Sequence, residues 1–207
     1  MTNVLLVEDS RITRDMLESH FEGSQDYMLI ATLENAANAE IVCMSGKVGL
    51  VLMDVCTADD ESGLVAAAKI KKHDPGIKII VMTSMPEYSF IQKAKEAGCD
   101  SFWYKEYGEA DLADVIDRTM RGESVYPPDT PPVTVGYANS SELTERELAV
   151  LRQLALGFKY DEIAENLNVS ANTVKYHIKN LLTKTGYRST LQLVVDVVGK
   201  RLILPKY

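Results

Sequence analysis

Short apolar runs alternate with amphipathic stretches along the first 122 residues. Uninterrupted apolar runs of four to eight residues are typical of parallel strands buried on both faces. The stretches between them carry apolar residues at helical spacing, as at Ile12 and Met16. Regular alternation of strand and helix predicts a doubly wound, flavodoxin-like α/β domain with five parallel strands. The five expected strands lie near residues 4–7, 27–33, 47–54, 77–82 and 101–104.

The pattern changes at a proline-rich stretch. Residues 123–141 contain four prolines and little apolar periodicity, which indicates an extended linker and a domain boundary. Beyond it only helical spacing is found, with a capping box at Thr144 and Glu147 and a tight turn ending at Ser170. Short helices joined by such a turn favour a four-helix helix-turn-helix fold. We therefore expect three parts, at residues 1–122, 123–141 and 142–207.

Charge separates the two expected domains. Residues 1–141 carry 12 Lys and Arg against 23 Asp and Glu, whereas residues 142–207 carry 10 against 7. A basic end on an acidic chain suggests a polyanion as the partner of that end only. No apolar run reaches the roughly 20 residues of a membrane span. Three scattered cysteines without metal-ligand spacing fit a reducing, cytoplasmic setting.

Polar residues follow the expected strands at their carboxyl ends. Glu8 and Asp9 follow the first strand, Asp54 ends the third, Thr83 follows the fourth, and Lys105 follows the fifth. Right-handed crossovers bring these ends to one edge of the sheet. Three carboxylates repel one another unless a cation lies between them, and Mg²⁺ prefers such hard oxygen ligands. Asp54 can then act as a nucleophile that accepts a phosphoryl group, with Lys105 and the Thr83 hydroxyl stabilising the transferred oxygens.

The stretch 171–184 predicts a basic surface. At about 100° per residue, Val174, His177, Ile178 and Leu181 share one arc, which we assign to the core. The stretch contains no acidic residue, and lysines on its outer arc can reach phosphates or guanine acceptors in a major groove. The alternative is an ordinary solvated helix face. The outer arc consists of Asn172, Lys175, Tyr176, Lys179 and Thr183.

Four motifs in residues 1–122 resemble the receiver domain of bacterial response regulators. They are Leu6-Val7-Glu8-Asp9, Leu52-Met53-Asp54, Val81-Met82-Thr83-Ser84, and Lys105 after Phe102. The resemblance implies that Asp54 is the phosphoacceptor and that a sensor histidine kinase is the partner. It also implies a Mg²⁺ site made by Glu8, Asp9, Asp54 and the backbone carbonyl of Cys56. Thr83 and Phe102 would be a switch pair, in which Phe102 moves inward.

The end of the chain is similar to the DNA-binding domain of the NarL/LuxR type. The resemblance rests on Leu143-Thr144, Arg146-Glu147, Glu162-Ile163-Ala164 and Thr173-Val174-Lys175, with His177, Leu181 and Lys184 beyond. It implies that Lys175, Tyr176 and Lys179 approach base edges of double-stranded DNA. Ser170, Thr173, His177 and Lys184 would lie near the DNA backbone. The last helix, at 190–200, would be either a dimer surface or simple core.

These observations predict a transcription factor of a two-component system, in which phosphorylation of Asp54 promotes homodimerisation and binding to a pseudo-palindromic site. Its chemistry would be limited to its own phosphorylation and dephosphorylation. The loop from Val55 to Gly63 lacks the proline usual in receivers, and Glu106 replaces another. One alternative is therefore a DNA-binding regulator whose receiver responds to a ligand or partner without phosphorylation. Two further alternatives are a phosphatase with an aspartyl nucleophile and a module that binds only proteins.

Overall fold

The computed structural model describes residues 1–106 and 111–204, without the side chain of Asp60. The described chain divides into two compact units. The first comprises Met1–Ser84 and Ser89–Asp129, and the second comprises Met85–Tyr88 and Thr130–Tyr207. Within the described part, no helix combines the length and the apolar character needed to cross a membrane.

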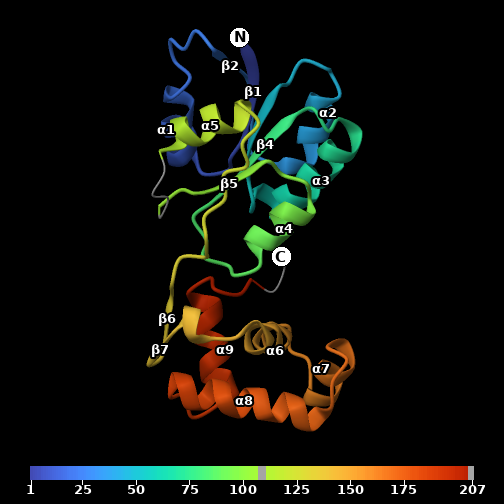
Figure 1. The fold of residues 1–207 in the computed structure, drawn as a ribbon, viewed down its shortest axis with the longest axis vertical. Helices are drawn as coiled ribbons and strands as arrows, with labels where there is room; N and C mark the ends of the chain where they lie inside the picture. The colour runs from blue at the N-terminus through green and yellow to red at the C-terminus, as the bar shows by residue number, and fades with distance from the viewer. Residues whose placement is uncertain (107–110, 205–207) are drawn as a thin grey trace. The chain divides into compact units, whose positions relative to one another are not determined.

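The first unit is built on a parallel sheet of five strands (Figure 1). The strand order is β2-β1-β3-β4-β5, and every neighbouring pair is parallel. This confirms the predicted flavodoxin-like α/β fold. The strands are β1 (Thr2–Val7), β2 (Tyr27–Leu33), β3 (Leu50–Asp54), β4 (Lys78–Thr83) and β5 (Ser101–Tyr104).

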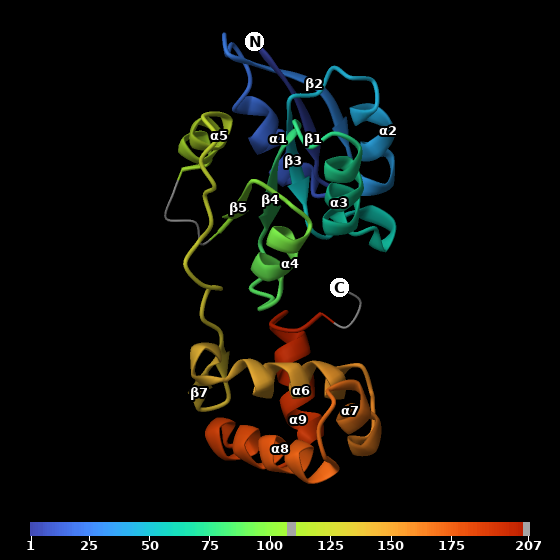
Figure 2. The same ribbon diagram turned by 45° about the vertical axis from the view of Figure 1, so that its right-hand side comes forward.

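Helices cover both faces of this sheet, as Figure 2 shows. Helices α1 (Arg11–Ser19) and α5 (Leu112–Met120) pack on one face, where Leu17, Val115 and Ile116 join the core. Burial on both sides explains why all five residues of β3 are buried. The opposite face carries α2 (Ala39–Cys43), α3 (Gly63–His73) and α4 (Phe90–Glu96), with short 3₁₀ turns at η1 (Ala36–Asn38) and η2 (Ala58–Asp60).

Helix α1 and the residues after it bury only part of the stripe predicted from the spacing of Ile12, Met16, His20 and Phe21. Phe21 is buried, but Ile12 and Met16 are 85% and 51% exposed, and Leu17, outside that stripe, is buried. Ile12 and Met16 have the same i, i+4 spacing as Leu17 and Phe21, so periodicity alone does not say which pair meets the sheet. The packed face is fixed only when the helix lies on β1 and β3.

Two further helices begin later than expected. Pro86 suits the first turn of a helix and so predicts a helix start there, but α4 begins at Phe90, and residues 85–88 group with the second unit. The apolar spacing of residues 109–121 also predicts a helix, which corresponds to α5 and begins at Leu112 after its N-cap Asp111. The expected first residues of that helix, 109 and 110, lie outside the described part of the chain.

The second unit is a helical domain that follows the predicted pattern. The predicted capping box forms at the start of α6 through two reciprocal hydrogen bonds. The Thr144 hydroxyl accepts from the amide of Glu147, and the Glu147 carboxylate accepts from the amide of Thr144. Gly186, with φ of 75°, ends α8 in the left-handed conformation that favours glycine. The helices are α6 (Glu145–Ala155), α7 (Tyr160–Asn166), α8 (Ala171–Thr185) and α9 (Thr190–Gly199).

The expected linker at 123–141 is extended only in part. Its second half forms a small hairpin of β6 (Thr134–Val135) and β7 (Ala138–Asn139), followed by a 3₁₀ turn, η3 (Ser140–Glu142). Val135 is fully buried against Leu193, Val197 and other apolar side chains of the helical unit. Val135 and Ala138 are both buried and anchor this segment, but so short a hairpin leaves no apolar periodicity in the sequence.

Candidate functional sites: an acidic pocket and a basic helix face

The predicted acidic pocket exists at the carboxyl edge of the sheet. Asp54 ends β3, and its Oδ2 lies 3.0 Å from the Nζ of Lys105, which follows β5. The same ammonium lies 2.5 Å from Oε2 of Glu8, directly after β1. All three side chains are at least nine-tenths buried. The topology therefore joins residues that are 46 to 97 positions apart in the sequence.

Burial and charge set the ionisation of this pocket. Burial raises the pKa of Asp54 to about 7, and Glu8 and Asp9 push it the same way against the opposing effect of Lys105. Burial alone would lower the pKa of Lys105, but Asp54 and Glu8 together hold it above its ordinary value. The pocket therefore concentrates negative charge around one buried ammonium. A further cation would relieve the remaining repulsion between the carboxylates.

The carboxylate arrangement fits a hard divalent cation. Glu8, Asp9 and Asp54 each offer an oxygen, and these oxygens lie within 4.8 Å of one another. Oxygen donors of this kind suit Mg²⁺, which binds through one or two carboxylates and retains water. Asp9 is exposed, so the group opens to solvent on one side. Cys56, whose carbonyl the resemblance adds to the set, lies two residues after Asp54 in the adjoining loop and pairs with Ser62 as an isolated β-bridge.

The expected switch residues lie on the two strands beside the pocket. Thr83 ends β4 and is buried, and its carbonyl accepts a hydrogen bond from the amide of Lys105 at 2.9 Å. Phe102, in the middle of β5, is only 2% exposed. Its ring lies 5.0 Å from that of Tyr104 and 6.4 Å from that of Tyr126. Phe102 therefore occupies a buried site in this structure already.

The unusual loop after Asp54 is well connected. The buried hydroxyl of Thr57 accepts from the amide of Ala36 and donates to the carbonyl of Glu61. Asp59 takes a left-handed conformation with φ of 60°, and its carboxylate accepts from the side chain of Asn35 at 2.9 Å. The loop lacks proline, but these bonds fasten it to the segment that follows β2.

Gly63 is a residue of this site that sequence reasoning missed. A Cβ at this position would lie 1.8 Å from the carbonyl oxygen of Asp54. The start of α3 therefore presses against the backbone of the candidate phosphoacceptor, and any side chain would displace one of them. A glycine soon after a strand-end aspartate is a weak signal in a single sequence, because glycine is common in loops.

Helix α8 presents the predicted basic face to solvent. Asn172, Lys175 and Lys179 are exposed, and Tyr176 is 61% exposed. On the other side, Val174, Ile178 and Leu181 are buried as predicted, but His177, assigned to the same core arc, is only half-buried. Among the described residues, no carboxylate lies within ion-pair distance of the ammonium of Lys175 or Lys179. Both charges are therefore available to a polyanion.

Four other residues expected near DNA have contacts inside the unit. Ser170 caps α8 by accepting from the amide of Thr173 at 3.1 Å, and their hydroxyls lie 2.8 Å apart. His177 is half-buried, with its ring 5.6 Å from that of Tyr176. Lys184 donates to the carbonyl of Glu142 and to the carboxylate of Glu147, each at 2.8 Å. These contacts hold the end of α8 against the start of α6.

A hollow of about 420 Å³ runs beside the two exposed lysines. Ile178 and Leu182 contribute apolar lining, and two tyrosines from outside the helix, Tyr160 and Tyr187, complete it. No sequence pattern singles out either tyrosine. Tyr160 opens α7 and Tyr187 follows α8, so only the folded unit brings them beside Lys175 and Lys179. The remaining lining residue is Thr183.

Two family profiles match the chain, one for each unit. Residues 4–117 match the response regulator receiver domain, and residues 141–197 match the luxR family of bacterial regulatory proteins. Among curated proteins, the response regulator protein VraR of Staphylococcus aureus is 33% identical over 210 residues, which cover 97% of this chain and 98% of VraR.

Solved structures agree in fold. RcsB from Salmonella enterica serovar Typhimurium, bound to promoter DNA in the presence of the phosphomimetic BeF₃⁻, is 21% identical with a TM-score of 0.62, covering 94% of this chain and 96% of that one. A two-component response regulator of the LuxR family from Aurantimonas sp. SI85-9A1 is 25% identical with a TM-score of 0.56, covering 62% of this chain and 91% of that one.

Proposed function

Because this chain belongs to the bacterial response regulators that join a receiver domain to a LuxR-family DNA-binding domain, we propose that phosphorylation of Asp54 controls its dimerisation and its binding to DNA. Both families are regulators, so the chain is a transcription regulator of a two-component system and not an enzyme. The observation that carries the proposal is the position of Asp54, buried at a strand end with Lys105 at 3.0 Å.

The transfer step follows from that geometry. An oxygen of Asp54 forms a bond to the phosphorus of the donor, a sensor histidine kinase, while the bond from phosphorus to the donor breaks and its electron pair leaves with the donor. The Lys105 ammonium is placed to neutralise charge on the transferred oxygens. Glu8, Asp9, Asp54 and the carbonyl of Cys56 would hold Mg²⁺, which supplies further charge neutralisation when bound.

The phosphoryl group would act on the switch pair. In the proposal the Thr83 hydroxyl donates to a new phosphoryl oxygen, and the environment of Phe102 changes with it. Such a local change biases an equilibrium between two states of the receiver. Phe102 is already buried, so we propose a shift within the buried site instead of an inward swing from solvent.

The output is proposed to be a homodimer on double-stranded DNA. Lys175, Tyr176, Lys179 and Asn172 would face the major groove, since all four are exposed on α8. Ser170, Thr173, His177 and Lys184 would lie nearer the backbone. Two copies related by a twofold axis would fit a pseudo-palindromic site. Helix α9 supports a dimer surface, because Leu191 and Val195 are 71% and 65% exposed while Leu193 and Val197 are buried.

The proposal divides the chain into three segments. We assign residues 1–122 to the receiver, 123–141 to the connecting segment and 142–207 to the DNA-binding domain. The division into compact units falls between Asp129 and Thr130, inside the connecting segment. We propose the bacterial cytoplasm as its location, because the composition and the two-component chemistry suit a compartment in which kinase and DNA are both accessible.

The proposal is tested by labelling and by DNA occupancy with the purified chain. Acetyl phosphate or the cognate kinase, with Mg²⁺, should label the wild type, and Asp54→Asn should abolish labelling and the associated gain in DNA occupancy. Asp59→Asn is the matched control, because it removes a carboxylate from the neighbouring loop while asparagine tolerates the left-handed conformation there.

The same experiment also distinguishes a second candidate function. The loop from Val55 to Gly63 is fixed by its own hydrogen bonds and carries acids at Asp59 and Glu61, which favours a receiver that senses a ligand or partner. Phosphorylation control would be contradicted if the wild type never labels but binds DNA specifically, and if Asp54→Asn leaves that binding unchanged. This outcome would support the alternative.

A further inference from the structure

The residues that follow α5 run along the free edge of β5. This strand is last in the sheet order, so its outer edge pairs with no other strand of the part of the chain that the structure describes. The carbonyl of Val125 accepts from the amide of Phe102 at 2.8 Å. The amide of Val125 donates to the hydroxyl of Ser101 at 3.0 Å. The backbone amide and carbonyl of Val125 therefore bond to Ser101 and Phe102, two consecutive residues of β5, and Phe102 is the expected switch residue.

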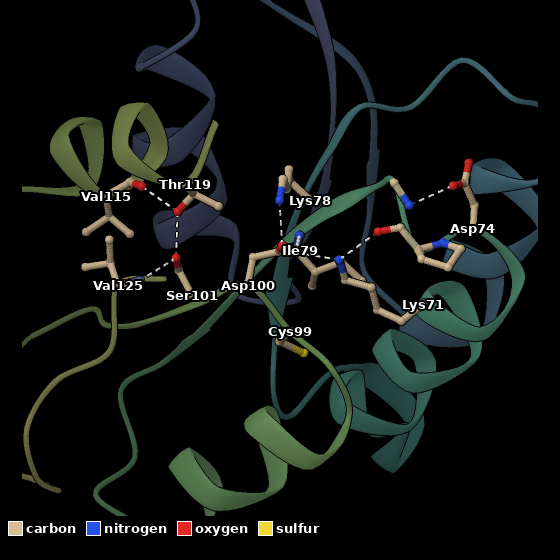
Figure 3. Close-up of polar contacts among 12 residues, drawn as sticks. Lys71, Asp74, Lys78, Ile79, Cys99, Asp100, Ser101, Val115, Thr119 and Val125 are labelled. Atoms are coloured by element: carbon tan, nitrogen blue, oxygen red, sulfur yellow. Dashed lines mark hydrogen bonds and ion pairs between the residues drawn. The ribbon is translucent and has the colours of Figure 1, made fainter. Parts of the chain in front are cut away.

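A buried relay supports the Val125 amide (Figure 3). The Thr119 hydroxyl donates to the carbonyl of Val115 at 2.6 Å, and the hydroxyls of Ser101 and Thr119 lie 2.6 Å apart. Since the Thr119 proton is already used, the Ser101 hydroxyl donates to Thr119 and accepts from Val125. Ser101 and Thr119 are both fully buried. Loss of Val125 would leave the Ser101 oxygen without this donor, so the arrangement favours a discrete closed state.

Tyr126 adds a second attachment. Its hydroxyl donates to the carbonyl of Cys99 at 2.8 Å, at the start of β5. Its ring lies 6.4 Å from that of Phe102, tilted by 30°, with the Lys95 ammonium 5.1 Å from the ring centre. Burial raises the pKa of the Tyr126 hydroxyl, which keeps it protonated as a donor. Phe102 is thus joined to this segment by a backbone hydrogen bond and by a ring contact.

We propose that Val125 and Tyr126 form a latch that fastens the start of the interdomain segment to β5, and that phosphorylation of Asp54 opens this latch through Phe102. The inference rests on the function proposed above and extends it to the connecting segment. A displacement of Phe102 carries its amide away from Val125 and its ring away from Tyr126. Opening frees residues 124–126 and adds about 10 Å to the reach of the connecting segment. Phosphorylation would thereby change the reach of the segment that leads to the DNA-binding unit.

Amide hydrogen exchange in the full-length protein tests the latch directly. We expect beryllofluoride with Mg²⁺, used as the phosphoryl mimic, to speed exchange of the Phe102 and Val125 amides about 3- to 10-fold, the effect of weakening one hydrogen bond. The Leu52 amide, in the buried strand β3, should keep its protection. Binding of the mimic with unchanged exchange at both amides overturns the latch and leaves the proposed function standing. Failure of the mimic to bind overturns both.

A variant pair tests the coupling from the other side. Tyr126→Phe keeps the ring and removes the bond to Cys99, so it should weaken the closed state in the unphosphorylated protein. Since coupling between two sites is reciprocal, it should also tighten beryllofluoride binding about 3- to 10-fold. Tyr137→Phe is the control, because Tyr137 lies in the other unit and is 89% exposed. The coupling would be overturned if Tyr126→Phe speeds exchange of the Val125 amide but binds beryllofluoride with the same affinity as the wild type.

Discussion

At the scale of single residues, Asp100 shows how a partly buried charge is held in this receiver. It precedes β5, at the opposite edge of the sheet from Asp54, and accepts from Lys71 at 2.6 Å, Lys78 at 2.9 Å and the amide of Ile79 at 2.9 Å (Figure 3). Burial alone would raise the pKa of Asp100, but the three donors together lower it below its ordinary value. The carboxylate joins α3 and β4 to the start of β5.

This arrangement predicts a pH-dependent loss in Asp100→Asn. A depressed pKa in the folded state contributes stability above the unfolded pKa of about 3.9, and that contribution is lost as the pH falls through the folded pKa. At pH 7 we expect the substitution to lower the free energy of unfolding by about 1–3 kcal/mol. The difference from wild type should shrink at pH values below 4. Urea unfolding followed by fluorescence of Trp103, the sole tryptophan, measures both.

Asp15→Asn is the control for this measurement, because Asp15 is 66% exposed and lies 3.9 Å from Arg11. An exposed pair of this kind contributes little to stability. A loss in Asp100→Asn that stays the same at low pH would show that the side chain acts through packing and not through its charge.

At the scale of elements, α8 divides its surface by function. Its inner stripe packs in the core of the helical unit, and its end is held by the ion pair between Lys184 and Glu147. Its outer stripe carries two lysines one turn apart, neither of which has an ion-pair partner among the described residues. A helix with this division can be rigid and still present free charge. The hollow bordered by Tyr160 widens the basic surface beyond the helix itself.

We therefore expect Lys175→Ala combined with Lys179→Ala to weaken DNA binding through lost phosphate or base contacts. If both lysines neutralise phosphates, the slope of log binding constant against log salt becomes shallower by about 2. A titration at several salt concentrations measures the slope. Lys72→Ala, which removes an exposed lysine from α3 in the receiver, is the matched control. An unchanged slope in the double variant would place the DNA contact on another surface.

At the scale of the whole molecule, the chain contains separate hydrophobic cores. The receiver core surrounds the sheet, whereas two clusters centred on Leu181 and Val174 hold the helical unit. Separate cores allow separate cooperative unfolding. Trp103 packs against the receiver core and so reports on that unit alone.

Ligand binding should consequently stabilise one unit selectively. Beryllofluoride with Mg²⁺ at about 100 times its dissociation constant should raise the free energy of unfolding of the receiver by about 2.7 kcal/mol. We expect the unfolding transition reported by Trp103 fluorescence to move to a higher urea concentration. The separate unfolding of the helical unit, followed by circular dichroism, should keep its urea midpoint. A single transition that moves as a whole would show that both units unfold together.

The sequence by itself determined the elements and the chemistry of the strand ends. Uninterrupted apolar runs are enough to predict parallel strands, because only burial on both faces tolerates them. The capping box at Thr144 and the glycine after α8 set helix limits through local hydrogen bonds and backbone conformation, which depend on near neighbours. The acidic pocket followed from the same logic, since topology places all strand ends at one edge.

The tertiary structure alone decided which faces pack and which distant groups meet. Spacing assigned Ile12 and Met16 to a helix face, but only the sheet beneath α1 selected Leu17 and Phe21 for burial. The contact of Gly63 with the Asp54 carbonyl depends on two chain segments whose separation in space no local pattern encodes. The same holds for Val125 on the edge of β5. Local interactions specify the elements, whereas these contacts arise only when the elements assemble around a common core.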